Sequence, residues 1–492
     1  MRTLSKSKIM AFRQCPRRVW LEVHRPDLKA DSAATEQSYE AGYAVGEVAR
    51  KLYDPEGRGV TLDFASTKFP QVFVATQNAM RDGCTIFEGA FEIPGALALA
   101  DVLIPQGHSW RMVEVKSSTR VKDAHRDDIA IQTHIVTQSG VPLKGVALAH
   151  VDNAWVYPGG DDYRGLLVEV DMTAEAFSRG PEVAQWIDQA QRIVAQSDMP
   201  AVRTGAHCDD PYSCGFYDHC TSLEPQAEMP IHWLPRFRPE PWIEQGVVDL
   251  RDVPTDALNA MQRRVRDCTA SGTVYFDAEG AAADLATHTL PGHFLDFETI
   301  QFAVPIWAGT RPYQQIPFQY SVHRLDANGA LAHGEFLDLS GTDPSRAFAE
   351  QLIADCGNTG PVFVYNAAFE RSRMAELAER FPDVKDGLEA IIARVVDLLP
   401  VARDRYYHPS QKGSWSIKAV LPAVVPELSY DALDGVRNGG DAQAAFLEAI
   451  HPQTDAAQRD ALRQQLLAYC ALDTYAMVRL WQVFAGRTDW TL

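Results

Sequence analysis

The chain has 492 residues, enough for roughly two to four domains of ordinary size. Hydrophobic residues make up 46% and charged residues 23%, which excludes a disordered chain, a collagen-like repeat and a small disulfide scaffold. The 46 Lys and Arg against 65 Asp and Glu give a net charge of −19, so any nucleic-acid site must be a local patch on an acidic protein.

Further features of the sequence narrow the class of protein. No run of about 18 apolar residues occurs, so no membrane span is expected, and the polar start is unlike a secretory signal. Ordinary cysteine usage, eight in the chain, favours a reducing cytoplasm. The sequence has no GxxxxGK[ST] loop, which argues against a P-loop ATPase.

Residues 1–225 are predicted to form a first α/β domain. Seven Lys or Arg and one acid occur in the first 26 residues, on an expected helix at 5–22 that would supply phosphate contacts. Further expected helices are 36–53 and 123–138, and expected strands are 85–93, 96–104, 109–118, 145–152 and 166–172. Mixed strands flanked by helices indicate an α/β sheet.

Residues 226–286 are predicted to bridge two domains. The stretch 225–242 has five prolines and several aromatic residues, which favours an extended connector. A polar helix is expected at 254–268 with Thr255 as its N-cap.

Residues 287–492 are predicted to form a second α/β domain. Strands are expected at 293–298, 318–325 and 361–366, followed by a helix from about 367 and a long final helix at 456–486.

The first candidate site combines Asp101 with Glu114 and Lys116. Strand periodicity places Glu114 and Lys116 on one face, and Asp101 ends the preceding strand. Two carboxylates beside an ammonium group can hold a divalent metal next to an activated water, with Gln132 from the next helix in reach. The alternative is a hairpin with a surface salt bridge.

This pattern resembles the PD-(D/E)xK nucleases of the RecB type over residues 1–225. The resemblance implies that Asp101 and Glu114 bind metal and that Lys116 is catalytic in phosphodiester hydrolysis. Gly46 stands where the group often has a helical His, with Glu47 next to it as a substitute, and Val136 replaces a Tyr. These departures leave a catalytically inactive domain that only binds nucleic acid as an alternative.

The second candidate site is a set of four cysteines, Cys15, Cys208, Cys214 and Cys220, the last three spaced C-x5-C-x5-C. Four thiolates suit a [4Fe–4S] cluster or a structural Zn²⁺, and the bland alternative is free core cysteines. One cysteine at the start and three at the end resemble the iron–sulfur nucleases of the AddB type and of CRISPR adaptation. The resemblance implies a structural cluster that joins the two ends of the domain.

The third candidate site gathers residues from three elements, namely Asp296, Glu298, Glu370, Tyr469 and Asp473. Asp296 and Glu298 share one strand face, Glu370 follows a strand, and Tyr469 and Asp473 share a helix face. Four carboxylates could hold two divalent ions around a phosphate, with the Tyr469 hydroxyl orienting the attacking water. The alternative is a helix cap for Glu370 and surface acids for the rest.

The order DxE, N-x3-E, Y-x3-D resembles the DnaQ-like 3′–5′ exonucleases over about 290–490, which implies an RNase H-like fold. Glu370 stands where that group has Asp, and Asp397 is a further acidic neighbour. HFLDFETI, YNAAFE, YYHP and KGSWSIKAVLP are similar to a bacterial family known as domain of unknown function 2779.

Together these patterns predict a Mg²⁺- or Mn²⁺-dependent nuclease acting on single-stranded DNA or duplex ends, with RNA left open. DNA repair and defence against foreign DNA are the expected settings. The rival hypotheses are a nucleic-acid-binding protein and a zinc-containing structural protein.

Overall fold

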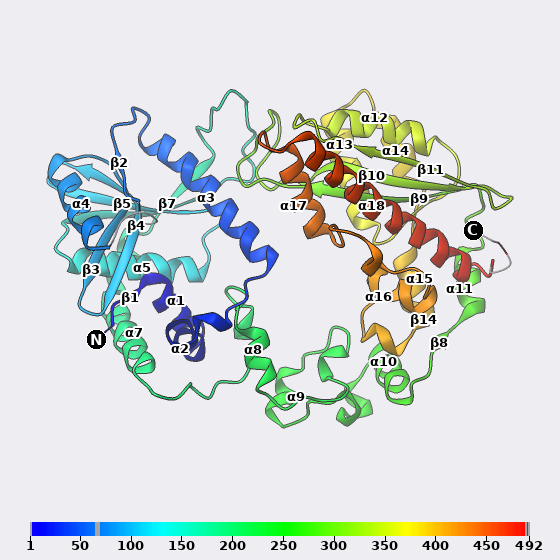
Figure 1. Cartoon of the computed structure of the whole chain (residues 1–492), viewed down its shortest axis with the longest axis horizontal. Helices are drawn as coiled ribbons and strands as arrows, with labels where there is room; N and C mark the ends of the chain where they lie inside the picture. Colours follow the sequence, from blue (N-terminus) through cyan, green and yellow to red (C-terminus); the bar gives the residue numbers. More distant parts are fainter. Residues whose placement is uncertain (1, 64–68, 488–489, 491–492) are drawn as a thin grey trace. The chain divides into compact units, whose positions relative to one another are not determined.

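The computed structural model describes residues 2–63, 69–487 and 490. They form two compact units: residues 1–225 with 302–314, and residues 226–301 with 315–492 (Figure 1). The segment 226–286, expected to bridge two domains, is part of the second unit. None of the helices described is both long and apolar enough to cross a lipid bilayer.

The first unit is built on a mixed sheet in the order β2-β3-β4-β5-β6-β7, with the short β1 beside β4. Its strands are β1 (Leu4–Ser5), β2 (Val60–Thr61), β3 (Ile86–Ile93), β4 (Ala96–Gln106), β5 (Ser109–Lys116), β6 (Leu143–Val151) and β7 (Leu167–Asp171). Strands β3, β4 and β5 are antiparallel neighbours, and β5 and β6 are parallel. The coarse expectation of an α/β sheet is confirmed.

Helices of the first unit surround this sheet. They are α1 (Lys6–Gln14), α2 (Pro16–His24), α3 (Ala33–Tyr53), α4 (Phe69–Asp82), α5 (Asp123–Gln138), α6 (Thr173–Ser178), α7 (Gly180–Val194) and α8 (Tyr217–Ser222). The single helix expected at 5–22 is wrong, because the chain breaks at Cys15, which is extended at φ −161 and ψ 125. Pro16 causes the break, since the ring of a proline disfavours helical backbone in the residue before it.

Residues 302–314 complete the first unit although they are distant from it in sequence. Ala303, Val304 and Tyr313 pack with Val45 and Val48 of α3. The backbones of Tyr157 and this segment exchange hydrogen bonds, from Tyr157 to Thr310 at 2.9 Å and from Gly309 to Tyr157 at 2.8 Å. The core of the first unit therefore includes a segment inserted between two strands of the second.

The second unit is built on a sheet in the order β11-β10-β9-β12-β13. Its strands are β9 (Gly292–Ile300), β10 (Ile316–Leu325), β11 (Leu331–Leu337), β12 (Val362–Val364) and β13 (Val395–Asp397), with a separate pair of β8 (Tyr275–Phe276) and β14 (Tyr406–Tyr407). The first three strands are antiparallel, and β12 and β13 run parallel to β9.

Helices of the second unit lie on both faces of its sheet. They are α9 (Glu240–Glu244), α10 (Ala260–Ser271), α11 (Ala278–Leu285), α12 (Ser345–Cys356), α13 (Ala368–Arg380), α14 (Lys385–Ile392), α15 (Leu398–Arg405), α16 (Ile417–Val424), α17 (Gly439–Ile450) and α18 (Ala456–Phe484). The helix expected to begin after Thr255 instead has Asn259 as its N-cap, in a capping box with Gln262. This box satisfies two backbone donors at once, which a Thr255 cap would not have done.

The alternation of side chains along β9 positions the acidic pair of the second unit. Leu295 and Phe297 enter the core formed with α12, α13 and α14. Phe294 faces the other way, with its ring 6.0 Å from that of Trp481 on α18, the long red helix of Figure 1. Asp296 and Glu298 share the parity of Phe294 and therefore point to the α18 side of the sheet.

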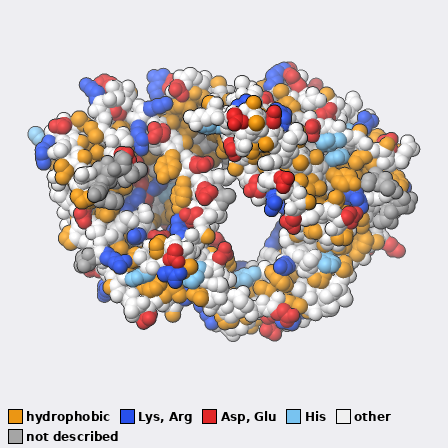
Figure 2. Space-filling view, viewed as in Figure 1, with side chains coloured by type: hydrophobic (Ala, Val, Ile, Leu, Met, Phe, Trp, Pro, Cys, Tyr) orange, Lys and Arg blue, Asp and Glu red, His pale blue; other side chains and the backbone are white. Residues whose placement is uncertain are grey.

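Charged side chains are mixed over the surface. Figure 2 shows one face of the molecule, on which Lys and Arg are interspersed with Asp and Glu. Local clusters, and not the net charge, therefore decide where an anionic ligand could bind.

Candidate metal and cysteine sites

A buried ion-pair network lies at the end of β5 in the first unit. The Lys116 ammonium donates to Glu114 Oε1 at 2.6 Å and to Asp128 Oδ2 at 2.5 Å. Lys6, at the start of α1, contacts the same two carboxylates at 3.1 Å and 3.0 Å. Burial alone would lower the pKa of Lys116, but the charges of Asp128 and Glu114 raise it well above its usual range. Both ammonium groups are therefore charged.

Asp101 stands next to this network on β4. Its Oδ2 accepts from the backbone amide of Val115 at 2.8 Å, which ties β4 to the strand bearing Glu114 and Lys116. Burial and the charge of Glu114 raise the pKa of Asp101 well above its usual range. The structure thus brings Asp101, Glu114 and Lys116 to one cleft of about 420 Å³, which Lys6 also lines.

Gln132 lies one helical turn after Asp128 on α5 and is fully buried. Its Nε2 donates to Asp128 Oδ1 at 3.1 Å, so it contacts the network through Asp128 and not through Glu114. Asp128 and Lys6 were missed as site residues in the sequence. Asp128 could have been found as the i−4 neighbour of Gln132, and Lys6 was visible only as one of seven basic residues near the N-terminus.

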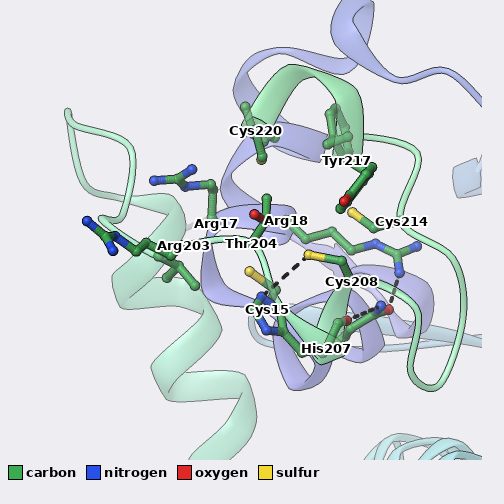
Figure 3. A pocket seen from close by; sticks show the side chains of 14 residues that line it. Cys15, Arg17, Arg18, Arg203, Thr204, His207, Cys208, Cys214, Tyr217 and Cys220 are labelled. Carbon is green, nitrogen blue, oxygen red and sulfur yellow. Dashed lines mark hydrogen bonds between the residues drawn. The ribbon is translucent and has the colours of Figure 1, made fainter. Parts of the chain in front are cut away.

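The four candidate cysteines line a common cavity in the first unit (Figure 3). Cys15 comes from the break between α1 and α2, Cys208 ends a short 3-10 helix, Cys214 lies in the following loop and Cys220 is on α8. All of them are free thiols, and burial raises the pKa of Cys208, Cys214 and Cys220. The chain folds so that residues about 200 positions apart face one another.

Cationic side chains surround this cavity. Arg17, Arg18 and Arg203 contribute to its lining, and Figure 3 shows the Arg18 side chain extending past Cys208 toward Cys214. The Arg17 Nη1 atom is buried without a hydrogen-bond partner. Arg17 also opposes the effect of burial on the pKa of Cys220. Such surroundings suit thiolates that carry negative charge.

Several basic residues of the N-terminus have acidic or aromatic partners within the first unit. Arg13 pairs with Asp127 at 3.1 Å and lies over the Trp186 ring at 4.1 Å. Arg18 pairs with Glu22 at 3.1 Å. Part of the basic charge of this segment is therefore neutralised by contacts within the first unit. The expected contact of the segment with phosphates stays a prediction.

Three carboxylates of the second unit converge at the edge between β9 and α18. One oxygen from each of Asp296, Glu298 and Asp473 lies within 4.8 Å of the other two. Glu298 and Asp473 are buried and Asp296 is half-buried. Carboxylate oxygens at this spacing form a donor set of the kind that Mg²⁺ and Mn²⁺ take in proteins.

The crowding of these acids perturbs their protonation. Burial, with the charge of Asp473, raises the pKa of Glu298 to about 8. Burial also raises the pKa of Asp473 to about 6, against the opposing hydrogen bonds of Tyr430 and Tyr469 and the charge of Lys418. The pKa of Asp296 is raised well above its usual range by burial and by the three neighbouring carboxylates. Without a cation the cluster holds protons near neutral pH.

Three cation or hydroxyl groups face these carboxylates. The Tyr430 hydroxyl donates to Asp473 Oδ1 at 2.5 Å. The Lys418 ammonium lies 4.9 Å from the centre of the Tyr469 ring and 5.2 Å from that of Tyr430. The predicted residue Tyr469 is therefore at the cluster, while Tyr430 was missed. It begins a short 3-10 helix in an irregular stretch, where no periodic pattern marks it.

Glu370 is near this cluster but outside its tight group. It lies in the first turn of α13, is buried, and has an Oε2 atom without a hydrogen-bond partner. Burial raises its pKa to about 8, and its charge in turn contributes to the raised pKa of Asp296. An unpartnered buried carboxylate oxygen is costly, and it is an available ligand atom.

Asp397 has a structural task. It is the N-cap of α15 and accepts from the backbone amides of Leu399 and Asn366, each at 3.0 Å, and of Ala367 at 3.1 Å. These bonds hold the turn that precedes α13, where Asn366 takes a left-handed φ of 81. Asp397 thereby fixes the direction in which Glu370 leaves the sheet.

Residues 293–416 match the family model described as Domain of unknown function (DUF2779). The resemblance to this family that the sequence motifs indicated is thereby confirmed. No curated protein matches the chain.

The DUF2779 match covers about a quarter of the chain. It contains Asp296, Glu298 and Glu370 and ends two residues before Lys418, so Tyr430, Tyr469 and Asp473 lie beyond it. The carboxylate cluster thus combines Asp296 and Glu298, which lie inside the matched region, with Asp473, which lies outside it in the sequence.

Proposed function

We propose that this protein is a metal-dependent nuclease that hydrolyses phosphodiester bonds in DNA, with a 3′–5′ exonuclease site in its second unit. The observation that carries the proposal is the convergence of Asp296, Glu298 and Asp473 within 4.8 Å. The raised pKa values of these acids support it, because protonated buried carboxylates mark a site whose charge needs a cation. The sheet order β11-β10-β9-β12-β13, with three antiparallel strands followed by two parallel ones, also supports the proposed RNase H-like fold.

The residues of this site have separable tasks. Asp296, Glu298 and Asp473 would hold the divalent ion, and Glu370 offers a further oxygen from α13. A bound Mg²⁺ or Mn²⁺ supplies an activated water and stabilises charge on the phosphate oxygens. Tyr430 fixes the orientation of Asp473 through its hydrogen bond, and Tyr469 would orient the attacking water.

Substrate contact has a candidate surface in the second unit. A cleft of about 450 Å³ is lined by Arg236, Arg403, Tyr365 and Trp415, together with Ser416 and Ile417, which directly precede Lys418. Two guanidinium groups can contact phosphates, and an aromatic wall suits an unpaired base. This composition supports a single strand as the ligand of an otherwise acidic protein.

The first unit is proposed to carry a second divalent-ion site, formed by Asp101 and Glu114, with the charged Lys116 positioning the attacking water or stabilising the charge that develops on the phosphate. The Glu114 Oε2 atom supports this assignment, since it is buried without a partner while Oε1 takes both lysines. Gln132 would act by holding Asp128 in place.

The four cysteines are proposed to hold a structural [4Fe–4S] cluster, with Zn²⁺ as the alternative. Four cysteines that line one cavity supply the number of thiolates that either group takes. The arginines that also line the cavity would balance part of the negative charge of these thiolates.

The test is cleavage of end-labelled DNA and RNA, single- and double-stranded, with Mn²⁺ and then with chelator. Metal-dependent shortening of single-stranded DNA from its 3′ end, lost in Asp473→Asn, is the expected result. Equal rates for wild type and Asp473→Asn at equal melting temperature would contradict the assignment of hydrolysis to this site.

A second candidate function is nucleic-acid binding without cleavage by the first unit. The observation that favours it is the pairing of Lys6 and Lys116 with Glu114 and Asp128, which satisfies the network without a metal. Cleavage that persists unchanged in Lys116→Ala, together with DNA binding that weakens, would support this alternative.

We propose that the protein acts in the bacterial cytoplasm, in DNA repair or in defence against foreign DNA. All eight cysteines are free, as in a reducing compartment.

A further inference from the structure

Helix α3, labelled in Figure 1, lines with one face the cleft of the first unit that Asp101, Glu114 and Lys116 also line. The residues of this face recur at helical spacing: Ser38, Tyr39, Gly42, Tyr43, Gly46, Ala49 and Arg50. A different face of α3 is apolar and packs into the core through Val45 and Val48. The helix is thus anchored by one face, and the face that lines the cleft is available to a ligand.

Two tyrosines on this face are exposed to solvent. Tyr39 is 53% exposed and Tyr43 is 77% exposed, the highest value among the large hydrophobic side chains that the structure describes. The two residues are four positions apart on α3, so their side chains are neighbours on one face of the helix. Exposed rings of this kind offer a flat, weakly hydrated surface to a planar ligand.

Each tyrosine is followed one helical turn later by a glycine, in the repeat YEAGYAVG of residues 39–46. A Cβ atom at Gly42 or at Gly46 would meet nothing within 4 Å, so the space next to both rings is open. Glycine is a poorer helix former than alanine, and no close neighbour requires it at these two positions. The repeat therefore keeps a strip of α3 free of side chains beside the rings, where a planar group can lie.

The charged side chains that line the cleft are balanced in number. They are three cations and three acids, namely Lys6, Arg50, Lys116, Glu88, Asp101 and Glu114. Phosphate contacts alone would hold a nucleic-acid strand weakly here, because neighbouring carboxylates offset the cations. Stacking of a base on an aromatic ring needs no net charge, and every nucleobase has a face for it. Aromatic contacts are therefore the ones that can retain a strand at this cleft.

The opposite wall of the argument is the chemistry of the cleft itself, whose volume of about 420 Å³ is ordinary for a ligand pocket. Glu114 is 1% exposed, and its Oε2 atom has no hydrogen-bond partner. Buried carboxylate oxygens are usually satisfied, so this atom indicates that a bound group completes the cleft. An unpaired nucleotide matches both features on α3 and on the sheet, since it carries a planar base and an anionic phosphate for Lys6 or Lys116.

We propose that Tyr39 and Tyr43 form a base-stacking surface, on which unpaired bases of a single nucleic-acid strand lie while its backbone enters the cleft of the first unit. The inference rests on the proposed contact of this unit with nucleic acid, and it applies whether the unit cleaves the strand or only binds it. Bases in an intact duplex have their faces covered by their neighbours, so the surface selects single strands and frayed ends.

The test is binding of a fluorescein-labelled single-stranded oligonucleotide to the full chain, measured by anisotropy with chelator present so that no strand is cut. Arg236→Ala and Arg403→Ala are present in every sample and weaken the proposed strand contact of the second unit. Tyr39→Ala combined with Tyr43→Ala should weaken binding by about tenfold or more, whereas Phe at both positions should preserve it. Phe177→Ala is the matched control and should leave the affinity unchanged, since Phe177 is 38% exposed on α6 and does not line the cleft.

Two further ligands separate stacking from other contacts. A strand with abasic sites keeps its phosphates and lacks the planar rings, so the double alanine variant should bind it no more weakly than the parent does. Intact duplex of the same sequence should be equally insensitive to the tyrosines. DNA and RNA strands are both measured, because the rings can stack on either, and the strand bound more tightly identifies the natural one.

Gly42→Leu tests the open strip of α3 by filling it. Leucine is a better helix former than glycine, and a Cβ atom at this position meets no neighbour, so the variant should melt no lower than the parent. Its side chain would occupy the space beside the two rings and should therefore weaken single-strand binding. Unchanged binding in a folded Gly42→Leu protein would contradict the proposed use of this strip.

The possible outcomes are distinguishable. If the parent binds the strand and the tyrosine variants bind it equally well, the stacking surface is overturned while the proposed nuclease function stands. If the loss is as large on the abasic strand, the tyrosines do not act on bases, and the surface is again overturned. Tyrosine-dependent binding by a protein that shows no metal-dependent cleavage would support the surface and contradict the proposed hydrolysis. If the parent binds no strand, both proposals fail.

Discussion

At the scale of single residues, the two candidate metal sites differ in how the negative charge of their carboxylates is balanced. In the first unit, Lys6 and Lys116 form ion pairs with the carboxylates of Glu114 and Asp128. In the second unit, Asp296, Glu298 and Asp473 share their surroundings with Lys418 at a distance and hold protons instead. The second site therefore depends more strongly on an added cation.

Replacing Asp473 by Asn should reduce exonuclease activity at least about a hundredfold, because the variant lacks a charged ligand of the proposed ion.

Tyr430→Phe should have a smaller effect, since it removes only the hydrogen bond to Asp473. Loss of that bond raises the pKa of Asp473 further, so the Tyr430→Phe defect should be larger at pH 6 than at pH 8. Time courses on 3′-labelled single strands at both pH values are the measurement, with thermal melts as the control for folding. A Tyr430→Phe defect of equal size at both pH values would contradict this role.

The metal-free protein should become less stable as pH rises from about 5 to about 8. The pKa of Glu298 and of Glu370 is about 8 in the folded protein and that of Asp473 about 6, while an unfolded carboxyl has a pKa near 4. The folded state then binds more protons than the unfolded state in this range, so the free energy of unfolding falls with increasing pH. Melting curves across the range should show this trend, and Mn²⁺ should reverse it at pH 8. A Glu298→Gln, Asp473→Asn double variant should show a flatter profile, and an equally steep one would refute the assignment.

At the scale of elements, prolines and glycines decide how the site residues are presented. Pro16 ends α1 and turns the chain so that Cys15 enters the cysteine cavity from a helix junction. Gly46 removes a side chain from the face of α3 that lines the cleft. Asn259 and Asp397 cap helices and so set where α10 and α15 begin.

Gly46→Ala should stabilise the protein by about 0.5–1 kcal/mol, because alanine is the better helix former and its Cβ meets no neighbour. The expected rise in melting temperature is about 2–4 °C for a unit of this size. Gly42→Ala on the same helix should behave alike, whereas Gly57→Ala should destabilise, since Gly57 has a φ of +65. A fall in melting temperature for Gly46→Ala would mean that this side of α3 is more crowded than the structure shows.

At the scale of the whole molecule, segments far apart in sequence complete each unit. The cysteine cavity joins the first 15 residues to the loop at 208–220, and residues 302–314 cover part of the core near α3. Both arrangements close long loops, whose ordering must be stabilised by contacts made only after folding.

Cys214→Ser should lower the iron content and the melting temperature of the first unit by several degrees, because the proposed cluster would close a loop of about 200 residues. Iron content and absorbance near about 400 nm in anaerobically purified protein are the measurements. Cys84→Ser is the matched control, since Cys84 is half-buried and outside the cavity. Protein that contains neither iron nor zinc would contradict the proposed cofactor.

Residues 1–225 expressed alone should be less stable than the same unit in the full chain. Removal of residues 302–314 exposes the apolar side chains that they cover, among them Val45, Val48, Val151 and Leu166. Hydrogen exchange of α3 should be faster in the fragment, and adding residues 302–314 as a peptide should slow it. Identical exchange in fragment and full chain would show that this packing contributes nothing to stability.

The sequence by itself determined the α/β class, the long helices α3, α5 and α18, the central strands of both sheets, and the acidic pairs Asp101–Glu114 and Asp296–Glu298 as candidate site residues. These features follow from local periodicity and from residue chemistry, which a short window of sequence contains. Asp296 and Glu298 on one strand face, or Tyr469 and Asp473 on one helix face, needed no knowledge of distant parts.

Only the tertiary structure decided which distant residues complete those sites. Lys6 reaches Glu114 from the N-terminus, and Tyr430 reaches Asp473 from an irregular segment. It also decided that residues 302–314 complete the first unit. Such contacts depend on how elements pack against each other. They could not be predicted, because Lys6 and Tyr430 have no local sequence pattern that distinguishes them from ordinary surface residues.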